Sequence, residues 1–170
     1  TLIVNEKKII EKEMVSGISY SKDESKVTIS GVPDKPGISA KIFGILSKSN
    51  INVDMIIQNI SPDGVSANLT FTLPTREINF VKKLLEKNKS SIMFKSISAN
   101  SNLAKVSVIG MGMKSQSGVA QKMFQSLGDN KINILAISTS EIKISVLINK
   151  KSAEKAVKAL HKAYNLSKKN

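Results

Sequence analysis

The sequence contains no cysteine and no tryptophan, and only 4% of its 170 residues are aromatic. Without cysteine, the chain has no disulfide scaffold, no zinc–thiolate site and no thiol nucleophile. This composition fits a reducing compartment, and we expect a cytoplasmic protein. With so few aromatic residues, the core is expected to consist mainly of Ile, Leu and Val. The one histidine, His161, is interpreted as a favourable charge near a helix C-terminus rather than as a catalytic group.

Long apolar runs are also missing. No stretch approaches the roughly 20 apolar residues that span a bilayer. The first residues, TLIVNEKKIIEKEM, lack the apolar segment of a signal peptide. We therefore expect no membrane partner.

Acidic residues are half as numerous as basic ones, since 13 Asp and Glu stand against 26 Lys and Arg, for a net charge of +13. Such an excess can favour nucleic acid. The lysines are scattered over predicted helices, however, and no set of aromatic residues for stacking bases accompanies them. We expect no nucleic-acid partner.

An internal repeat organises the chain. Of the residues that recur at an offset of 81 positions, eight fall at the same point of the same pattern, and this agreement indicates a duplicated structural unit. The matched pairs are Val27 and Val108, Gly31 and Gly112, Gly37 and Gly118, Phe43 and Phe124, Leu46 and Leu127, Ile51 and Ile132, Asn52 and Asn133, and Ile56 and Ile137.

In the first unit, β-branched alternation and helical spacing predict the order βαββαβ, the ferredoxin-like arrangement. The expected elements are strands at 26–32, 52–60, 67–73 and 91–98 and helices from Gly37 and over 76–86, with Pro36 in the first turn of the earlier helix. Along the strand at 52–60, one face is expected to pack under the helices and the other to carry polar residues. The packed set is Ile51, Val53, Met55 and Ile57, and the polar set is Asn52, Asp54 and Gln58.

The second unit repeats this order but lacks its last strand. Strands are expected at 103–110, 132–139 and 141–148, the last two as a tight hairpin, with helices at 117–127 and 152–164. The remaining segment, NLSKKN, is too polar for a core strand. We expect the strand at 14–21 to cross over and complete the second sheet, which would interlock the two units and cover an open edge.

Four segments, GVPDKPG, NINVDMIIQN, SVIGMGMKS and ISTSEIKISVLI, resemble the regulatory region of bacterial aspartate kinase (aspartokinase), which holds two tandem ACT domains. The likeness covers about residues 14–164, and STSEIKISVL with the later ALH is its most specific part. The resemblance implies an α+β fold of two interlocked ferredoxin-like ACT domains. The first would be 22–99 and the second 14–21 plus 100–170, with 1–13 as a linker or the tail of a kinase domain.

The same resemblance implies feedback inhibition by lysine, threonine or both. The implied partners are the catalytic domain of aspartate kinase, which phosphorylates L-aspartate with ATP, and a second copy in a homodimer. The chain itself carries no evident catalytic residue, metal site or cofactor site. Its segment from Gly110 to Ser115 lacks the third glycine of GxGxxG and the spacing of a P-loop.

An amino-acid effector brings a carboxylate and an ammonium group. The N-terminus of a helix suits the carboxylate, and glycine-led helix starts at Gly37 and Gly118 would let it approach. Asp34 would either take the ammonium or cap the helix. By resemblance, the effector positions are Asp34, Gly37, Ile38 and Gln58 in the first unit and Asn133 and Ile134 in the second, with Ser138, Thr139 and Ser140 in a segment linked to the response. The alternative for these last three residues is a hydroxyl-rich turn. The alternative for the polar face of the strand at 52–60 is that its side chains are simply solvated.

The chain departs from the family pattern at two places. Gln116-Ser117 stands where a His-Pro pair is usual, and Ala67-Asn68 where a Thr-Asp pair is common. These departures leave the effector and the number of competent sites open. The two alternative functions are an RNA-binding RRM-like module, which Phe71 as the only aromatic of the relevant strands disfavours, and a structural subunit without an effector.

Overall fold

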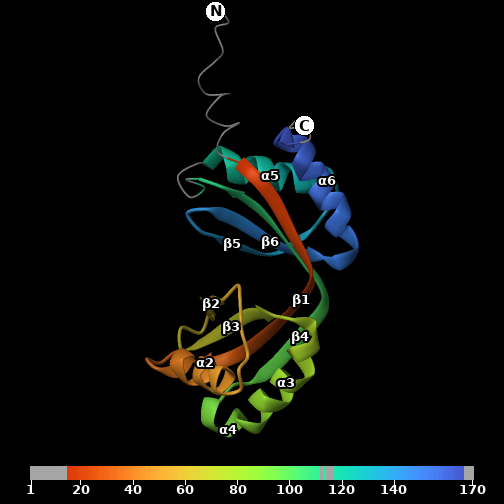
Figure 1. The fold of residues 1–170 in the computed structure, drawn as a ribbon. Helices are drawn as coiled ribbons and strands as arrows, with labels where there is room; N and C mark the ends of the chain where they lie inside the picture. Colours follow the sequence, from red (N-terminus) through yellow and green to blue (C-terminus); the bar gives the residue numbers. More distant parts are fainter. Residues whose placement is uncertain (1–14, 112, 114–116, 167–170) are drawn as a thin grey trace, which may run out of the picture. The chain divides into compact units, whose positions relative to one another are not determined.

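The chain divides into two compact units that share two long strands. The computed structural model describes residues 15–111, 113 and 117–166, so the expected tail at 1–13 lies outside the described residues. The first unit is Asp23–Asn102, and the second unit comprises the residues up to Lys22 and those from Leu103 on. Strands β1 (Val15–Pro33) and β4 (Ser96–Gly110) contribute to both (Figure 1).

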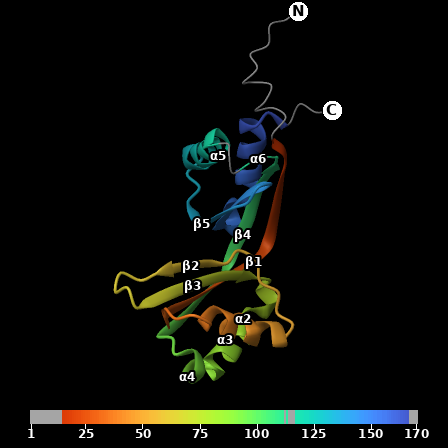
Figure 2. The ribbon, with the colours of Figure 1, turned by 90° about the vertical axis from the view of Figure 1, so that its left-hand side faces the viewer.

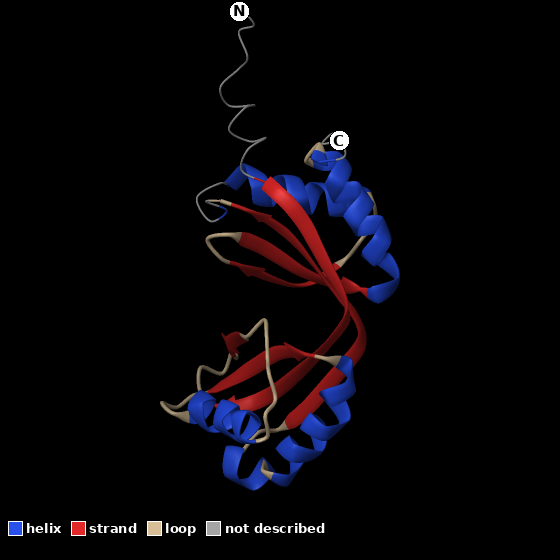
Figure 3. Cartoon of the chain, viewed as in Figure 1, coloured by secondary structure: helices blue, strands red, loops and turns tan. Residues whose placement is uncertain are grey.

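The first unit has the predicted βαββαβ order. Its strand order is β2-β3-β1-β4, as in a ferredoxin-like sheet. Helices cover one face of these strands, as Figure 3 shows. The further elements are α2 (Ile38–Lys48), β2 (Ile57–Ile60), β3 (Ser66–Leu73), a 3₁₀ turn η1 (Thr75–Glu77), α3 (Ile78–Lys87) and α4 (Lys89–Ile92).

The second unit uses the first half of β1 as its fourth strand. Its strand order is β1-β4-β6-β5. Val15 is buried in the second unit's core, and the Ser16 hydroxyl donates to the Ile109 carbonyl at 3.2 Å. This arrangement fits the interlocked fold expected from the sequence. The further elements are α5 (Ser117–Asp129), β5 (Ile134–Thr139), β6 (Lys143–Asn149), a 3₁₀ turn η3 (Lys150–Ser152) and α6 (Ala153–Ala163).

The two units end their first helices in the same way. Asn50 after α2 and Lys131 after α5 both adopt left-handed backbone, with φ of 55° and 56°. The next residues, Ile51 and Ile132, donate their N–H groups to the carbonyls of Leu46 and Leu127. These bonds satisfy carbonyls that the helix ends leave open. Because all three positions match at the offset of 81, the geometry supports the duplication inferred from sequence.

Each unit has its own core, which is mainly aliphatic as predicted. In the first unit, Ile29, Leu46 and Phe71 are fully covered, and the Phe43 ring meets Phe71 edge to face at 5.9 Å between centroids. Burial of this apolar surface is the main term that stabilises each unit.

The polar stretch Lys22–Ser25 does not break β1, although the sequence predicted separate strands at 14–21 and 26–32. Its side chains have partners: Lys22 Nζ pairs with Glu154 Oε1 at 2.6 Å, and Asp23 Oδ1 accepts from the Thr75 N–H. The Ser25 hydroxyl donates to that of Thr75 at 3.1 Å. Because these groups are satisfied in extended backbone, no loop is needed.

The predicted strand at 91–98 is wrong in its first half. Ser91 and Ile92 belong to α4, which ends at Met93 with a left-handed φ of 62°. Ile92 and Phe94 are nonetheless buried in the first core. The apolar alternation that predicted a strand therefore reflects burial around a helix end. From Ser96, β4 runs without a break through the strand predicted at 103–110.

The predicted strand at 52–60 is also too long. Only Ile57–Ile60 form β2, and the preceding residues make no regular ladder. Ile51 and Val53 pack against the first core as predicted. The predicted faces of Ile57 and Gln58, however, are exchanged, because Ile57 pairs with Thr70 and Gln58 with core-facing Leu69. Residues opposite each other share a face, so the irregular segment resets the alternation.

Tyr164 ties the end of α6 to the start of α5, and it generates the first prediction. Its hydroxyl donates to the Val119 carbonyl at 2.6 Å, and burial raises the pKa of the phenol well above its usual range. We expect Tyr164→Phe to destabilise the second unit by about 1 kcal/mol, because one buried hydrogen bond is lost. Tyr20→Phe is the control, since Tyr20 is 51% exposed. Calorimetric melting checks this, and equal melting curves for the two variants would contradict it.

Candidate functional site

A Pro–Gly turn sets the start of α2. The Ile38 N–H donates to the Lys35 carbonyl at 3.3 Å, which closes a four-residue turn. Gly37 occupies its third position with φ 87° and ψ −11°. These angles are those of a type II turn, which favours proline second and requires glycine or asparagine third. Pro36 thus belongs to the turn before the helix, not to the first helical turn as predicted, and Gly37 is the N-cap.

The first turn of α2 leaves backbone donors open. Lys41 N–H already bonds to the Gly37 carbonyl. The N–H groups of Ser39 and Ala40 have no partner among the described residues, and no side chain caps the helix. Open N–H groups and the helix dipole together favour an anion such as a carboxylate. No neighbouring atom comes within 4 Å of where a Cβ on Gly37 would lie, so the approach is open.

Asp34 lies exposed beside this turn. Its backbone N–H donates to the Val65 carbonyl at 3.1 Å, which ties the turn to the loop between β2 and β3. Of the two roles weighed for its carboxylate, capping α2 is wrong, because Gly37 is the N-cap. Ile38 is half-buried and packs against the first core, so it anchors the helix start.

Gln58 reaches the same corner from β2. Figure 2 shows the hairpin of β2 and β3 with α2 on one side of it. Because the ladder places Gln58 on the helix-covered face, its side chain meets α2, and Oε1 accepts from the Ser39 hydroxyl at 2.9 Å. Ser39 was missed by sequence reasoning. Its one signal was a hydroxyl two residues after the helix-starting glycine. We name Asp34, Gly37, Ile38, Ser39 and Gln58 the α2 corner.

The loop beside the α2 corner is held rigidly by Asp63. Its carboxylate accepts from the N–H groups of Val65 and Ser66 and from the Ser66 hydroxyl, the last at 2.7 Å. Led by the bond from the Ser66 hydroxyl, these contacts hold the pKa of Asp63 below its usual range. The carbonyl of Val65, which receives the Asp34 N–H, is thereby fixed in place.

The second-unit candidates lie along β5 and its ends. Asn133 is exposed just before the strand, and Ile134 is half-buried against the second core and pairs with Ile148. Ser138 pairs with Ser145, and Thr139 with core residue Ile144, so these two neighbours face opposite sides of the sheet. The first-unit and second-unit candidates are therefore each gathered within their own unit.

Ser140 lies in the turn between β5 and β6. Its N–H donates to the Lys143 carbonyl at 2.8 Å, and its hydroxyl accepts from the Ile142 N–H at 3.4 Å. The alternative interpretation of a hydroxyl-rich turn therefore holds for this residue. The predicted tight hairpin is confirmed.

The second helix start differs from the first. Helix α5 begins at Ser117, so Gly118 lies inside it and has no left-handed φ. The expected second glycine-led start is thus wrong. Ser117 rather than proline precedes Gly118, so the sequence lacks the Pro–Gly pair that favours a type II turn. Gln116, the other half of this departure from the family pattern, lies outside the described residues, as do Gly112, Lys114 and Ser115 of the glycine-rich segment.

Asn68, from the other departure Ala67-Asn68, has a structural role. The ladder between β1 and β3 is interrupted between Ile29 and Val32, and Gly31 there has a left-handed φ of 68°. The Asn68 side chain accepts from the Gly31 N–H at 3.2 Å. Asn68 thus supports a bulge in β1, where one residue loses its partner in the ladder.

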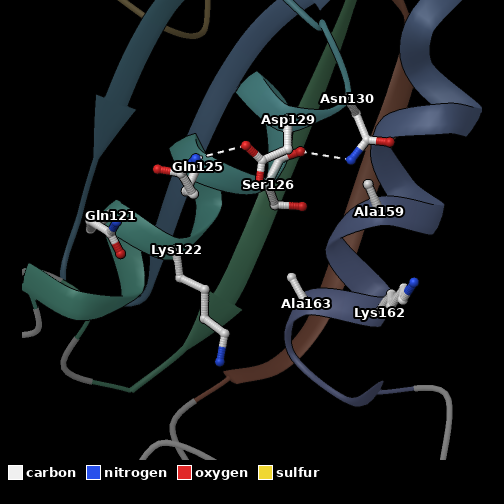
Figure 4. A pocket seen from close by; sticks show the side chains of 9 residues that line it. All are labelled: Gln121, Lys122, Gln125, Ser126, Asp129, Asn130, Ala159, Lys162 and Ala163. Atoms are coloured by element: carbon white, nitrogen blue, oxygen red, sulfur yellow. Dashed lines mark hydrogen bonds between the residues drawn. The ribbon is translucent and has the colours of Figure 1, made fainter.

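The second unit also has a groove of about 460 Å³ between α5 and α6 (Figure 4). Its polar groups bind each other: Gln125 donates to Asp129 at 2.7 Å, and the Asn130 side chain donates to the Ser126 carbonyl at 2.8 Å. None of the predicted effector residues lines it. The lining residues are Gln121, Lys122, Gln125, Ser126, Asp129, Asn130, Ala159, Lys162 and Ala163.

The part of the chain that the structure describes contains neither a candidate metal site nor a candidate membrane-spanning helix. No group of three or more His, Asp and Glu side chains there could hold a metal ion. No described helix has the length and apolar character needed to cross a membrane. Phe71, the one aromatic of the strands that an RRM would use, is fully buried in the first core and cannot stack on a base.

Gly37 yields the second prediction. A residue with a Cβ resists left-handed backbone by about 1–2 kcal/mol, so Gly37→Ala is expected to destabilise the first unit by about 1 kcal/mol. Gly44→Ala is the matched control in the same helix. It has ordinary helical backbone and free space for a methyl group, so it should be neutral or stabilising. Denaturant melts of both variants test this, and equal effects of the two would count against it.

Comparison with known proteins identifies the family. Residues 27–87 and again 106–164 match the ACT domain family. The aspartate kinase of Pseudomonas fluorescens (strain SBW25) is 45% identical over 167 residues, which are 98% of this chain and 40% of that protein. The chain thus spans about two fifths of the length of this relative.

Solved structures agree. A chain in the crystal structure of aspartokinase alpha and beta subunits is 43% identical with a TM-score of 0.81, over 89% of this chain and 99% of that one. The regulatory subunit of aspartate kinase from Thermus flavus is 36% identical with a TM-score of 0.82, over the same shares. With both ferredoxin-like units matched, and 89% of the chain aligned to these regulatory subunits, the chain belongs to the ACT domain family, as the tandem regulatory part of an aspartate kinase.

Proposed function

We propose that the chain binds an end-product amino acid, lysine or threonine or both, and so mediates feedback inhibition of aspartate kinase. The observation that carries this is the α2 corner, where the open N–H groups of Ser39 and Ala40 lie beside the Gln58 side chain and the exposed Asp34. Donors and an acceptor are thus present within one small region. This is the pairing that a zwitterion requires.

The ligand's groups would divide between these partners. The carboxylate is placed at the first turn of α2, where the helix dipole favours negative charge. The ammonium is assigned to the Asp34 carboxylate, which has no role as a cap. Gly37 allows close approach because it has no side chain, and Ile38 supplies an apolar wall.

The remaining wall is assigned to the second-unit residues Asn133 and Ile134 of a second copy in a homodimer. Asn133 is exposed and its amide can both donate and accept. Ser138, Thr139 and Ser140 are assigned to the response rather than to first contact. Ser138 is cross-strand from Ser145, whose hydroxyl bonds to Ser107 at 2.7 Å, so a shift of β5 would reach the centre of the second sheet.

Inhibition follows if the effector binds one arrangement of the ACT units better than another. The bound state then gains population, and the attached catalytic domain, which transfers phosphate from ATP to L-aspartate, is biased with it. A coupling of about 1–3 kcal/mol suffices for useful regulation. This catalytic domain lies outside the 170 residues.

Thermal shift of the 170-residue chain against the twenty amino acids gives the third prediction. Lysine or threonine at about 100 times its Kd should raise Tm by about 5–10 °C, because a ligand that binds only the folded state stabilises it by roughly 2.7 kcal/mol. The other amino acids should have little effect. A flat response to all twenty would support the structural-subunit alternative and overturn the proposal.

Gln58→Ala should weaken this response, with Asn59→Ala as its matched control. Asn59 is the next residue of β2 and pairs with Asn68, so it faces the opposite side of the sheet. Loss of the Gln58 contact should lower affinity about tenfold. Equal responses of the two variants would exclude the α2 corner as the site.

A further inference from the structure

The hydrogen bond between Ser39 and Gln58 joins two elements that the fold brings together at the α2 corner. Ser39 is the second residue of α2, and Gln58 is the second residue of β2. The Ser39 hydroxyl donates to Gln58 Oε1 at 2.9 Å. Gln58 is exposed, and among the described residues its side chain makes this one hydrogen bond.

The bond also fixes which end of the carboxamide is available. A glutamine side chain carries an acceptor oxygen and a donor NH₂ group. Because the hydroxyl proton of Ser39 occupies Oε1, the Nε2 group with its two N–H donors remains for another partner. The nearby open N–H groups of Ser39 and Ala40 are also donors. Donors from the strand and from the helix are therefore open in the same corner.

We propose that Ser39 is a positioning residue that orients the Gln58 amide so that Nε2 donates to the carboxylate of the bound amino acid. This inference rests on the proposed function. A freely rotating amide would present its oxygen to the carboxylate for part of the time, which is repulsive. The Ser39 hydroxyl removes that orientation before the ligand arrives, so less ordering accompanies binding.

The repeat offers an internal comparison. At the offset of 81, Ala120 stands in place of Ser39 and Thr139 in place of Gln58. Neither alanine nor threonine can reproduce the hydroxyl–carboxamide pair. Among the described residues, the pair is therefore present at the α2 corner and has no counterpart at α5 and β5.

The test compares Ser39→Ala with Ser39→Thr by calorimetric titration with lysine and threonine. Ser39→Ala removes the hydroxyl and should lower the affinity for the amino acid about threefold to tenfold. Its unliganded Tm should stay unchanged or rise, because alanine favours helix more than serine does. Affinity then falls without any loss of stability, which a merely structural role of Ser39 would not produce. Ser39→Thr keeps a hydroxyl and should retain most of the affinity.

A second readout isolates the carboxylate. The amino acid that binds is compared with its carboxamide analogue, which lacks the negative charge. Ser39→Ala should lower the affinity for the amino acid and leave the affinity for the carboxamide nearly unchanged. Equal loss for both ligands, or no loss for either, would overturn the positioning role.

The outcomes separate this inference from the proposed function. If the unsubstituted chain binds the amino acid and Ser39→Ala binds it equally well, the role of Ser39 is refuted and the proposed function stands. Absence of binding to the unsubstituted chain refutes the proposed function and this inference together.

Discussion

The left-handed backbone of Gly37 determines where α2 begins and which groups it offers. Pro36 and Gly37 close a type II turn onto the Lys35 carbonyl, so the helix starts immediately after the loop rather than through a side-chain cap. The first-turn donors are left open as a consequence. Side-chain capping would satisfy one of those donors and stabilise the helix by about 1 kcal/mol. An uncapped start therefore forgoes stability and keeps a surface that favours anions.

The duplication supplies the scaffold, and its divergence confines the polar corner to one unit. Both units end their first helix with the same left-handed residue and the same returning N–H bond, at Asn50 and Lys131. Their helix starts differ, because Gly37 precedes α2 whereas Gly118 lies within α5. Equal units would present two similar corners. These units are specialised instead, with Gln58 on β2 where the second unit has Thr139.

Much of the fold could be predicted because apolar periodicity records burial. The helices near Ile42 and Met123 and the hairpin of β5 and β6 follow directly from it. The errors arose where burial and secondary structure separate. Ile92 and Phe94 are buried around a helix end, and Lys22–Ser25 stay extended because distant residues satisfy them. Neither effect is visible in local sequence.

The candidate site shows the same division. Asp34, Gly37 and Gln58 were named from resemblance, but period-two alternation placed Gln58 on the wrong face. Its true face depends on the irregular segment before Ile57, whose backbone no simple periodicity encodes. Ser39 was missed for a related reason: its role exists only because β2 returns beside α2, a contact between residues 19 positions apart.

The most direct measurement is a ¹H–¹⁵N NMR titration of the 170-residue chain with lysine and with threonine. The account predicts that the largest shifts occur at the backbone amides of Ser39 and Ala40 and at the side-chain NH₂ of Gln58. Shifts concentrated instead at Gln121, Gln125 and Asn130, in the groove between α5 and α6, would contradict it.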